Sequence, residues 1–249
     1  MYCYTSQIQF KDKEINLKPG EIISYREMCN AEKVEVLQRG MNYRLHSNYS
    51  VLLMSTRSNA PYEDEVKENG KVLIYEGHDI PISTDVQNPK LLDQPMYTKT
   101  GKLTQNGLFY EAAKSFKKGN RLPELVQVYE KIKAGVWVFN GQFELRDGWL
   151  DGSKHRIVFK FRLQARDNMQ IIDELSGQSV EIEHNRLIPS SVKVEVWKRD
   201  KGRCVKCNSN TNLHFDHIIP YSRGGTSLSL KNIQILCMSC NLAKSDKIE

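Results

Sequence analysis

Short runs of β-branched and aromatic residues, separated by turn residues, dominate the first 188 positions of the chain. Such runs are typical of β-strands. They predict strands at residues 49–54, 71–75, 135–139 and 156–163. Helices are predicted at residues 106–118 and 123–131. The pattern therefore indicates a curved or barrel-like sheet with a few helices, which places the chain in the α+β class.

The predicted elements beyond residue 190 are shorter. Val192, Val194 and Val196 alternate with polar residues, which would suit a strand, although a helix that ends near Lys201 is also compatible with this segment. Further along, short strands are predicted around residues 216–220 and 233–236, followed by a last helix that carries Asn241 and Lys244.

Two domains are the natural division of a chain of 249 residues. Pro189-Ser190-Ser191 interrupts the strand pattern just before the C-terminal elements. We predict an N-terminal domain at residues 1–180, a linker at residues 181–191 and a small C-terminal domain at residues 192–249.

Four of the six cysteines form two Cys-x-x-Cys pairs, Cys204/Cys207 and Cys237/Cys240. One such pair could be a redox motif or a coincidence, but two pairs about thirty residues apart are typical of a tetrahedral zinc site. A structural Zn²⁺ there would stabilise a segment that is too small to bury a core of its own. Many four-cysteine zinc modules bind a partner without catalysing a reaction, so the zinc site alone does not predict an enzyme.

Polar residues inside and beside this cysteine frame could perform chemistry. Asp216 and the amide oxygen of Asn241 are hard oxygen ligands of the kind that Mg²⁺ or Mn²⁺ prefers. A histidine such as His217 titrates near neutral pH and can act as a general base. Phosphodiester cleavage needs both an activated water and neutralisation of developing charge.

The order of these residues resembles the HNH endonuclease family, whose ββα-metal fold places a histidine on a strand, an asparagine in the following loop and a third His or Asn on a helix. His217, Asn232 and Asn241 match those positions over about 55 residues. The resemblance implies that Asp216 and Asn241 hold the catalytic metal, that His217 deprotonates water, and that Asn232 fixes the loop and orients the histidine. It also favours a helix around Val194. Lys244 could meet a DNA phosphate or be an ordinary solvated lysine.

Charge is compatible with a polyanionic substrate. The net charge is +6, and from residue 189 onward there are ten Lys and Arg residues against five Asp and Glu. The N-terminus has neither the basic region nor the apolar stretch of a signal peptide, and no run approaches the length of a membrane span. We expect a cytoplasmic protein in which Cys3 and Cys29 are unpaired thiols.

Two N-terminal segments, residues 61–77 and 93–106, together with residues 40–43 and 135–141, resemble an SRA domain, a PUA-like module that recognises modified cytosine by flipping it out of the duplex. Joined to the HNH segment, the chain resembles the SRA-HNH modification-dependent restriction endonucleases. The resemblance implies double-stranded DNA containing modified cytosine as the partner.

The SRA resemblance also implies a base pocket. Tyr62 and Tyr75 would stack on the flipped base, and a carboxylate such as Glu65 can accept a hydrogen bond from the exocyclic amine of cytosine. Glu76 could either face a hydroxymethyl group or lie outside the pocket. The family commonly has Asp and Thr where this chain has Glu65 and Glu76, so 5-methylcytosine and 5-hydroxymethylcytosine both remain candidate bases. Ordinary packing of both tyrosines within a sheet is the alternative.

The sequence thus predicts an endonuclease that depends on cytosine modification. The alternatives are a sequence-reading or nicking HNH endonuclease, a modified-DNA reader that does not cleave, and a zinc-module transcription factor. One HNH site cuts one strand, so a homodimer is one way to cut both. The sequence context, the distance from the modified base to the cut and the oligomeric state are not predicted.

Overall fold

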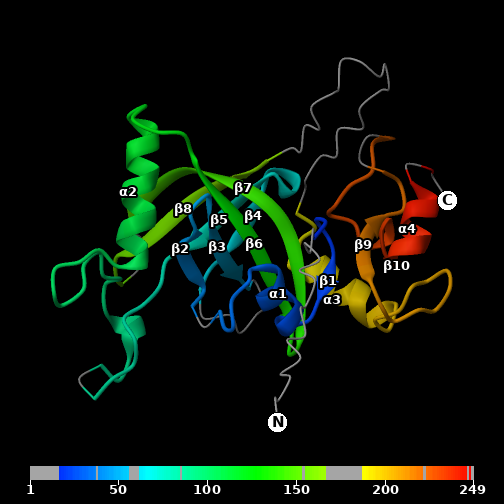
Figure 1. The fold of residues 1–249 in the computed structure, drawn as a ribbon, viewed down its shortest axis with the longest axis horizontal. Helices are drawn as coiled ribbons and strands as arrows, with labels where there is room; N and C mark the ends of the chain where they lie inside the picture. The colour runs from blue at the N-terminus through cyan, green and yellow to red at the C-terminus, as the bar shows by residue number, and fades with distance from the viewer. Residues whose placement is uncertain are drawn as a thin grey trace, which may run out of the picture.

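The computed structural model describes residues 17–37, 39–55, 62–84, 86–152, 155–166, 187–220, 223–245 and 247. A large sheet lies beside a small C-terminal module, with α2 across one side of the sheet (Figure 1). The N-terminal elements are β1 (Ile22–Ile23), α1 (Tyr25–Ala31), β2 (Met41–His46), β3 (Tyr49–Met54), β4 (Glu65–Lys67), η1 (Glu68–Gly70), β5 (Val72–Glu76), η2 (Pro89–Leu91), α2 (Gln105–Lys117), β6 (Glu124–Lys133), β7 (Val136–Asp151) and β8 (Val158–Ala165).

The large sheet has the strand order β2-β3-β6-β7-β8-β5-β4, with β1 paired to β7. Strands β3 and β6 run parallel, whereas the other pairs are antiparallel. The register shifts between Val128 and Tyr129 on β6 and between Leu145 and Asp147 on β7. Such bulges increase local twist, and the long strand β7 bends across the molecule in Figure 1.

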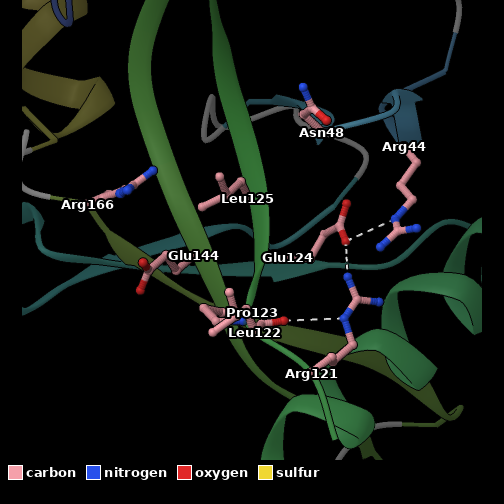
Figure 2. A pocket seen from close by; sticks show the side chains of 9 residues that line it. All are labelled: Arg44, Asn48, Arg121, Leu122, Pro123, Glu124, Leu125, Glu144 and Arg166. Carbon is pink, nitrogen blue, oxygen red and sulfur yellow. Dashed lines mark hydrogen bonds and ion pairs between the residues drawn. The ribbon is translucent and has the colours of Figure 1, made fainter.

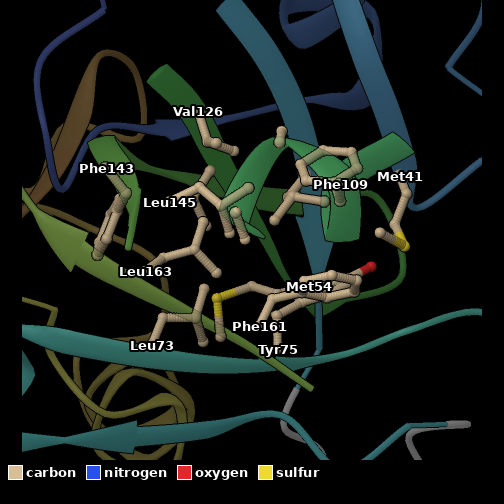
Figure 3. Close-up of a cluster of buried hydrophobic side chains, with 14 of the residues drawn as sticks. Met41, Met54, Leu73, Tyr75, Phe109, Val126, Phe143, Leu145, Phe161 and Leu163 are labelled. Atoms are coloured by element: carbon tan, nitrogen blue, oxygen red, sulfur yellow. The ribbon is translucent and has the colours of Figure 1, made fainter. Parts of the chain in front are cut away.

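Apolar side chains cover both faces of this sheet. On β3, Leu52 and Met54 enter the cluster beneath α2, while Val51 joins the cluster beside α1. This alternation follows from the two-residue period of a strand. Phe109 brings α2 onto the first cluster, which also contains Phe161 (Figure 3). Thr104 caps the helix by accepting a hydrogen bond from the backbone N–H of Gly107.

The C-terminal module contains two short strands between two helices. Its elements are α3 (Ser190–Arg199), β9 (Leu213–His217), η4 (Leu230–Asn232), β10 (Ile233–Cys237) and α4 (Met238–Lys244). Strands β9 and β10 pair antiparallel, with Asp216 opposite Gln234. This arrangement is the expected ββα order.

The α+β class and most predicted elements are confirmed, with α2 at the predicted position and a helix, not a strand, around Val194. The helix predicted at residues 123–131 is wrong, because this segment forms β6. Its burial alternates along the chain, and β3 and β7 hydrogen-bond to it on both sides. The strand predicted around residues 216–220 lies earlier, at Leu213–His217, so Asp216 and His217 stand at its end.

Part of the predicted linker packs closely against the large sheet. Leu187 is buried in the cluster beneath α2, and its backbone N–H donates to Gly70 O at 2.9 Å. Ile188 is buried in a third cluster, and α3 starts at Ser190. The rest of the predicted linker lies outside the described residues, and the domain boundaries remain a prediction.

The longest described helix has 13 residues, and no helix in the described part of the chain could span a membrane. Cys29 is a buried free thiol, in agreement with the prediction, whereas Cys3 lies outside the described residues.

Candidate functional site

The four predicted cysteines converge. The sulfur atoms of Cys204, Cys207, Cys237 and Cys240 all lie within 4.8 Å of one another. Four thiolates at Zn–S distances of about 2.3 Å in a tetrahedron would be about 3.8 Å apart, so this set fits Zn²⁺. Burial opposes ionisation of Cys204, but backbone N–H groups of Cys207, Cys237 and Lys206 outweigh it and lower the pKa of this thiol to about 6.

Asp216 and His217 end strand β9, where Lys244 from α4 reaches them. Lys244 Nζ donates to His217 O at 2.7 Å and lies 3.1 Å from Asp216 Oδ2. Only 1% of Lys244 is exposed, so its ammonium is held inside the module and does not face outward toward a phosphate. The geometry gives Lys244 the role of joining α4 to the end of β9.

Asp216 retains one carboxylate oxygen for a further ligand. Its Oδ2 accepts a hydrogen bond from Gln234 Nε2 at 3.2 Å and pairs with Lys244. Among the described residues, no hydrogen bond reaches Oδ1. Asn241 lies three residues before Lys244 on α4, a spacing that places the two residues on the same side of a helix. Carboxylate and amide oxygens such as those of Asp216 and Asn241 are the ligand types that a hard divalent cation prefers.

Asn232 fixes the loop that follows His217. Its Oδ1 accepts from Ile219 N at 2.8 Å, and its Nδ2 donates to the carbonyl oxygens of Ile219 and Thr226, each at 3.1 Å. A Cβ at Gly225 would lie 1.8 Å from Ile219 O, so only glycine permits this close approach. These hydrogen bonds tie Asn232 to both sides of the loop, between Ile219 and Thr226.

Sequence reasoning missed Ser227, whose Oγ lies 2.9 Å from His217 Nε2. Ser227 is fully buried, which holds its hydroxyl at one position beside the imidazole. A donor or acceptor at one imidazole nitrogen sets the tautomer and therefore the role of the other nitrogen. A lone serine in a polar loop carries no sequence signal that could have identified it.

The two tyrosines predicted to line a base pocket meet through a histidine. The rings of Tyr62 and His78 are stacked, with centroids 5.1 Å apart and planes 16° apart. Tyr75 Oη lies 3.0 Å from His78 Nε2, but Tyr75 is only 1% exposed and belongs to the cluster beneath α2. Burial lowers the pKa of His78 to about 4, so this ring is neutral at physiological pH.

Carboxylates also gather beside these rings. Asp64 Oδ1 accepts from Glu76 N at 3.0 Å, and burial raises the pKa of Asp64 to about 7. Glu76 is buried and pairs with Lys160 at 2.9 Å and Arg156 at 3.4 Å.

Glu65 does not join this group. Its side chain is exposed on β4 and pairs with Lys67 at 2.9 Å. The carboxylate that does join the group is that of its half-buried neighbour Asp64, because adjacent residues of an extended chain point to opposite sides. Sequence reasoning missed both Asp64 and His78.

A separate cavity of about 470 Å³ lies near the start of β6 (Figure 2). Arg44 and Arg121 both pair with the buried Glu124 there. The two guanidinium groups are therefore already engaged by a carboxylate. The residues that line the cavity are Arg44, Asn48, Arg121, Leu122, Pro123, Glu124, Leu125, Glu144 and Arg166.

Residues 204–247 match the HNH endonuclease family. No curated protein matches the sequence significantly. Similar solved structures include the SUVH5 SRA domain with hemimethylated CG DNA, at 24% identity and a TM-score of 0.42 over 61% of this chain and 90% of that chain. The same domain with fully hydroxymethylated CG DNA matches at 20% identity and a TM-score of 0.43, over 61% of this chain and 91% of that chain. The modification-dependent restriction endonuclease AspBHI matches at 15% identity and a TM-score of 0.40, over 56% of this chain and 66% of that chain.

Proposed function

We propose that this chain, whose C-terminal module is an HNH endonuclease module, cleaves double-stranded DNA that contains modified cytosine. The observation that carries the proposal is the convergence of Asp216, His217 and Asn232 at the end of β9, in the hairpin whose other end carries Cys237 of the four-cysteine cluster. The N-terminal sheet would recognise the modified base, and the C-terminal module would hydrolyse the phosphodiester bond.

His217 is the general base in this proposal. We assign its Nε2 hydrogen to Ser227 Oγ, which places the lone pair that accepts the proton of water on Nδ1. Asn232 keeps the loop closed behind the imidazole through Ile219 and Thr226. Buried Lys244 holds the backbone of His217 in place.

Asp216 Oδ1 and the side-chain oxygen of Asn241 would hold Mg²⁺ or Mn²⁺. The chemistry supplied there by such an ion is neutralisation of the charge that develops on the phosphate and the leaving oxygen. Gln234 and Lys244 orient the Asp216 carboxylate through its other oxygen.

The base pocket is proposed around Tyr62, Tyr75, Asp64 and Glu76. Tyr62 supplies an aromatic face, although His78 covers it in the present structure. A flipped base that stacks there would displace the imidazole of His78. Glu76 and Asp64 would supply polar contacts from the floor, where Lys160 and Arg156 already neutralise Glu76. Either 5-methylcytosine or 5-hydroxymethylcytosine is the proposed base.

Matched duplexes with cytosine, 5-methylcytosine or 5-hydroxymethylcytosine at one position test this function. We expect Mg²⁺-dependent cleavage of at least one modified duplex and little cleavage of the unmodified one. Equal cleavage of all three would indicate a sequence-reading endonuclease. Selective binding without cleavage would indicate a reader. Because one site cuts one strand, we also propose that two copies act together on a duplex.

Tyr62→Ala is expected to weaken binding to the modified duplex by about 1–3 kcal/mol, the range for losing a stacked base. Binding to unmodified DNA should change little, since phosphate contacts carry it. Tyr62 is preferred to Tyr75 for this test because Tyr75 is part of the core.

The matched control for Tyr62→Ala is Tyr97→Ala, which removes an exposed tyrosine. Fluorescence anisotropy with both duplexes measures the difference. Equal losses on modified and unmodified DNA for Tyr62→Ala would show that Tyr62 does not contact the base.

A further inference from the structure

A short N-terminal segment connects the two sheets through its backbone. Gly20 N donates to Phe139 O of β7 at 2.8 Å, and Phe215 N of β9 donates to Gly20 O at 3.0 Å. The backbones of Glu21 and His214 also pair as an isolated antiparallel β-bridge. The hydrogen bonds therefore run from β7 through residues 20 and 21 into β9, which ends in Asp216 and His217.

This contact requires glycine. Gly20 has φ of +87°, and a Cβ there would lie 2.9 Å from Phe215 O. Near this contact β1 lies against β9, and α3 lies against both β6 of the large sheet and β10 of the C-terminal module (Figure 1). The first residues of β9 are thus held by the N-terminal part of the chain.

One apolar cluster spans the same boundary. It is continuous from the large sheet through α3 to the paired strands of the C-terminal module. Its buried members are Ile132, Val138, Ile188, Val192, Val196, Cys204, Leu213, Phe215, Ile233, Ile235, Leu236 and Cys237. Closely packed side chains of this kind resist sliding, because displacement would open voids between them.

A buried polar network lies within this boundary. Lys193 of α3 places Nζ 2.6 Å from Glu130 Oε2 of β6, and the two residues are 1% and 0% exposed. Asn140 Nδ2 donates to Glu130 Oε2 at 3.0 Å, while Ser190 Oγ donates to Glu130 Oε1. Both carboxylate oxygens are occupied.

Because its hydrogen bonds are directional, this network depends on the orientation of α3 relative to β6. Burial lowers the pKa of Lys193, so the charged ammonium depends on Glu130 beside it. Moving α3 away from β6 would leave the carboxylate buried without its partner, which is strongly unfavourable. A shifted arrangement could preserve the apolar contacts in part, but not these hydrogen bonds.

We propose that this interface holds the nuclease site at one fixed position relative to the N-terminal sheet, with Lys193 and Glu130 as positioning residues. The consequence, which rests on the proposed function, is that cleavage occurs at a set distance from the modified base. A flexible connection would instead allow a range of distances.

Distances between two spin labels, measured by double electron–electron resonance, test whether the nuclease site is fixed relative to the N-terminal sheet, and the test needs no DNA. Spin labels attached at Leu122 and Leu242, which are 84% and 63% exposed, report on the two parts of the chain. Labelling by unnatural amino acids spares the four zinc-site cysteines. The wild-type protein is expected to give one narrow distance distribution. A broad distribution for the wild type would overturn the proposal.

The double variant Glu130→Met/Lys193→Met tests the two positioning residues. It removes both charges together, so that neither is left buried without its partner, whereas Lys193→Met alone leaves Glu130 unpaired and could simply unfold the protein. The double variant is expected to stay folded and to show a broader distance distribution. An unchanged distribution in a folded double variant would overturn the positioning role.

The functional readout is the cut position on an end-labelled duplex with one modified cytosine. We expect one main position for the wild-type protein and several for the double variant. Several positions for the wild type, or one unchanged position for the double variant, would contradict the inference. Cleavage that ignores the modification would contradict the proposed function instead, and the spin-label distances would still decide whether the interface is fixed.

Discussion

His217→Ala is expected to reduce DNA cleavage by about 10²–10⁴-fold, the usual contribution of a general base. The reason is local, because the variant removes the proton acceptor while Asp216, Asn241 and the zinc-site cysteines remain. Single-turnover cleavage of a modified duplex at saturating Mg²⁺ measures the loss.

Two controls separate chemistry from folding in this variant. DNA affinity and zinc content should remain close to the wild-type values, since His217 pairs with Ile233 at one end of the hairpin and Cys237 pairs with Leu213 at the other. Ser227→Ala should lose less activity than His217→Ala, because it keeps the imidazole and removes only its partner at Nε2. Near-normal turnover by His217→Ala would exclude the proposed mechanism.

The C-terminal module could be predicted in detail because its chemistry depends on local spacing. Two cysteine pairs identify the cluster, the residues between them include two paired strands, and a helix begins within the second pair. The position of Lys244 shows the limit of this reasoning. Sequence spacing places it on the same helical face as Asn241, but only the structure shows that this face is turned inward.

The large sheet could be predicted only in part, because its strands form through hydrogen bonds to segments that are distant in the sequence. Residues 123–131 contain residues that suit a helix, yet β3 and β7 pair with them on either side. The sixteen-residue strand β7 shows the same effect, since only its apolar start resembled a strand. In both segments, hydrogen bonding to neighbouring strands determines the secondary structure.

The base pocket and the interface depend on the direction of individual side chains. A one-residue step separates exposed Glu65 from half-buried Asp64, and the stack of His78 on Tyr62 brings together two segments of the chain. The interface depends on Gly20 meeting Phe215, nearly two hundred residues away along the chain. The local periodicity of the sequence does not predict such long-range contacts.

Cys237→Ser is expected to remove the structural metal and unfold the C-terminal module. Metal binding at such a site is coupled to folding, with apparent free energies of about 10–16 kcal/mol for structural zinc in small modules. Cys237 also precedes α4, which carries the proposed metal ligand Asn241 and the buried Lys244 that holds the end of β9, so its loss would disrupt the proposed active site. Metal content by mass spectrometry and the thermal unfolding curve measure the effect, and cleavage should be lost together with the metal.

The matched control is Cys29→Ser, which replaces a buried thiol outside the cluster and should retain the metal. Because Cys204 and Cys237 belong to the apolar cluster shared with β6 and β7, Cys237→Ser should also loosen the interface. The rest of the large sheet keeps its own two clusters and should stay folded. A Cys237→Ser protein that kept one zinc per chain and full activity would show that these cysteines are not the metal ligands.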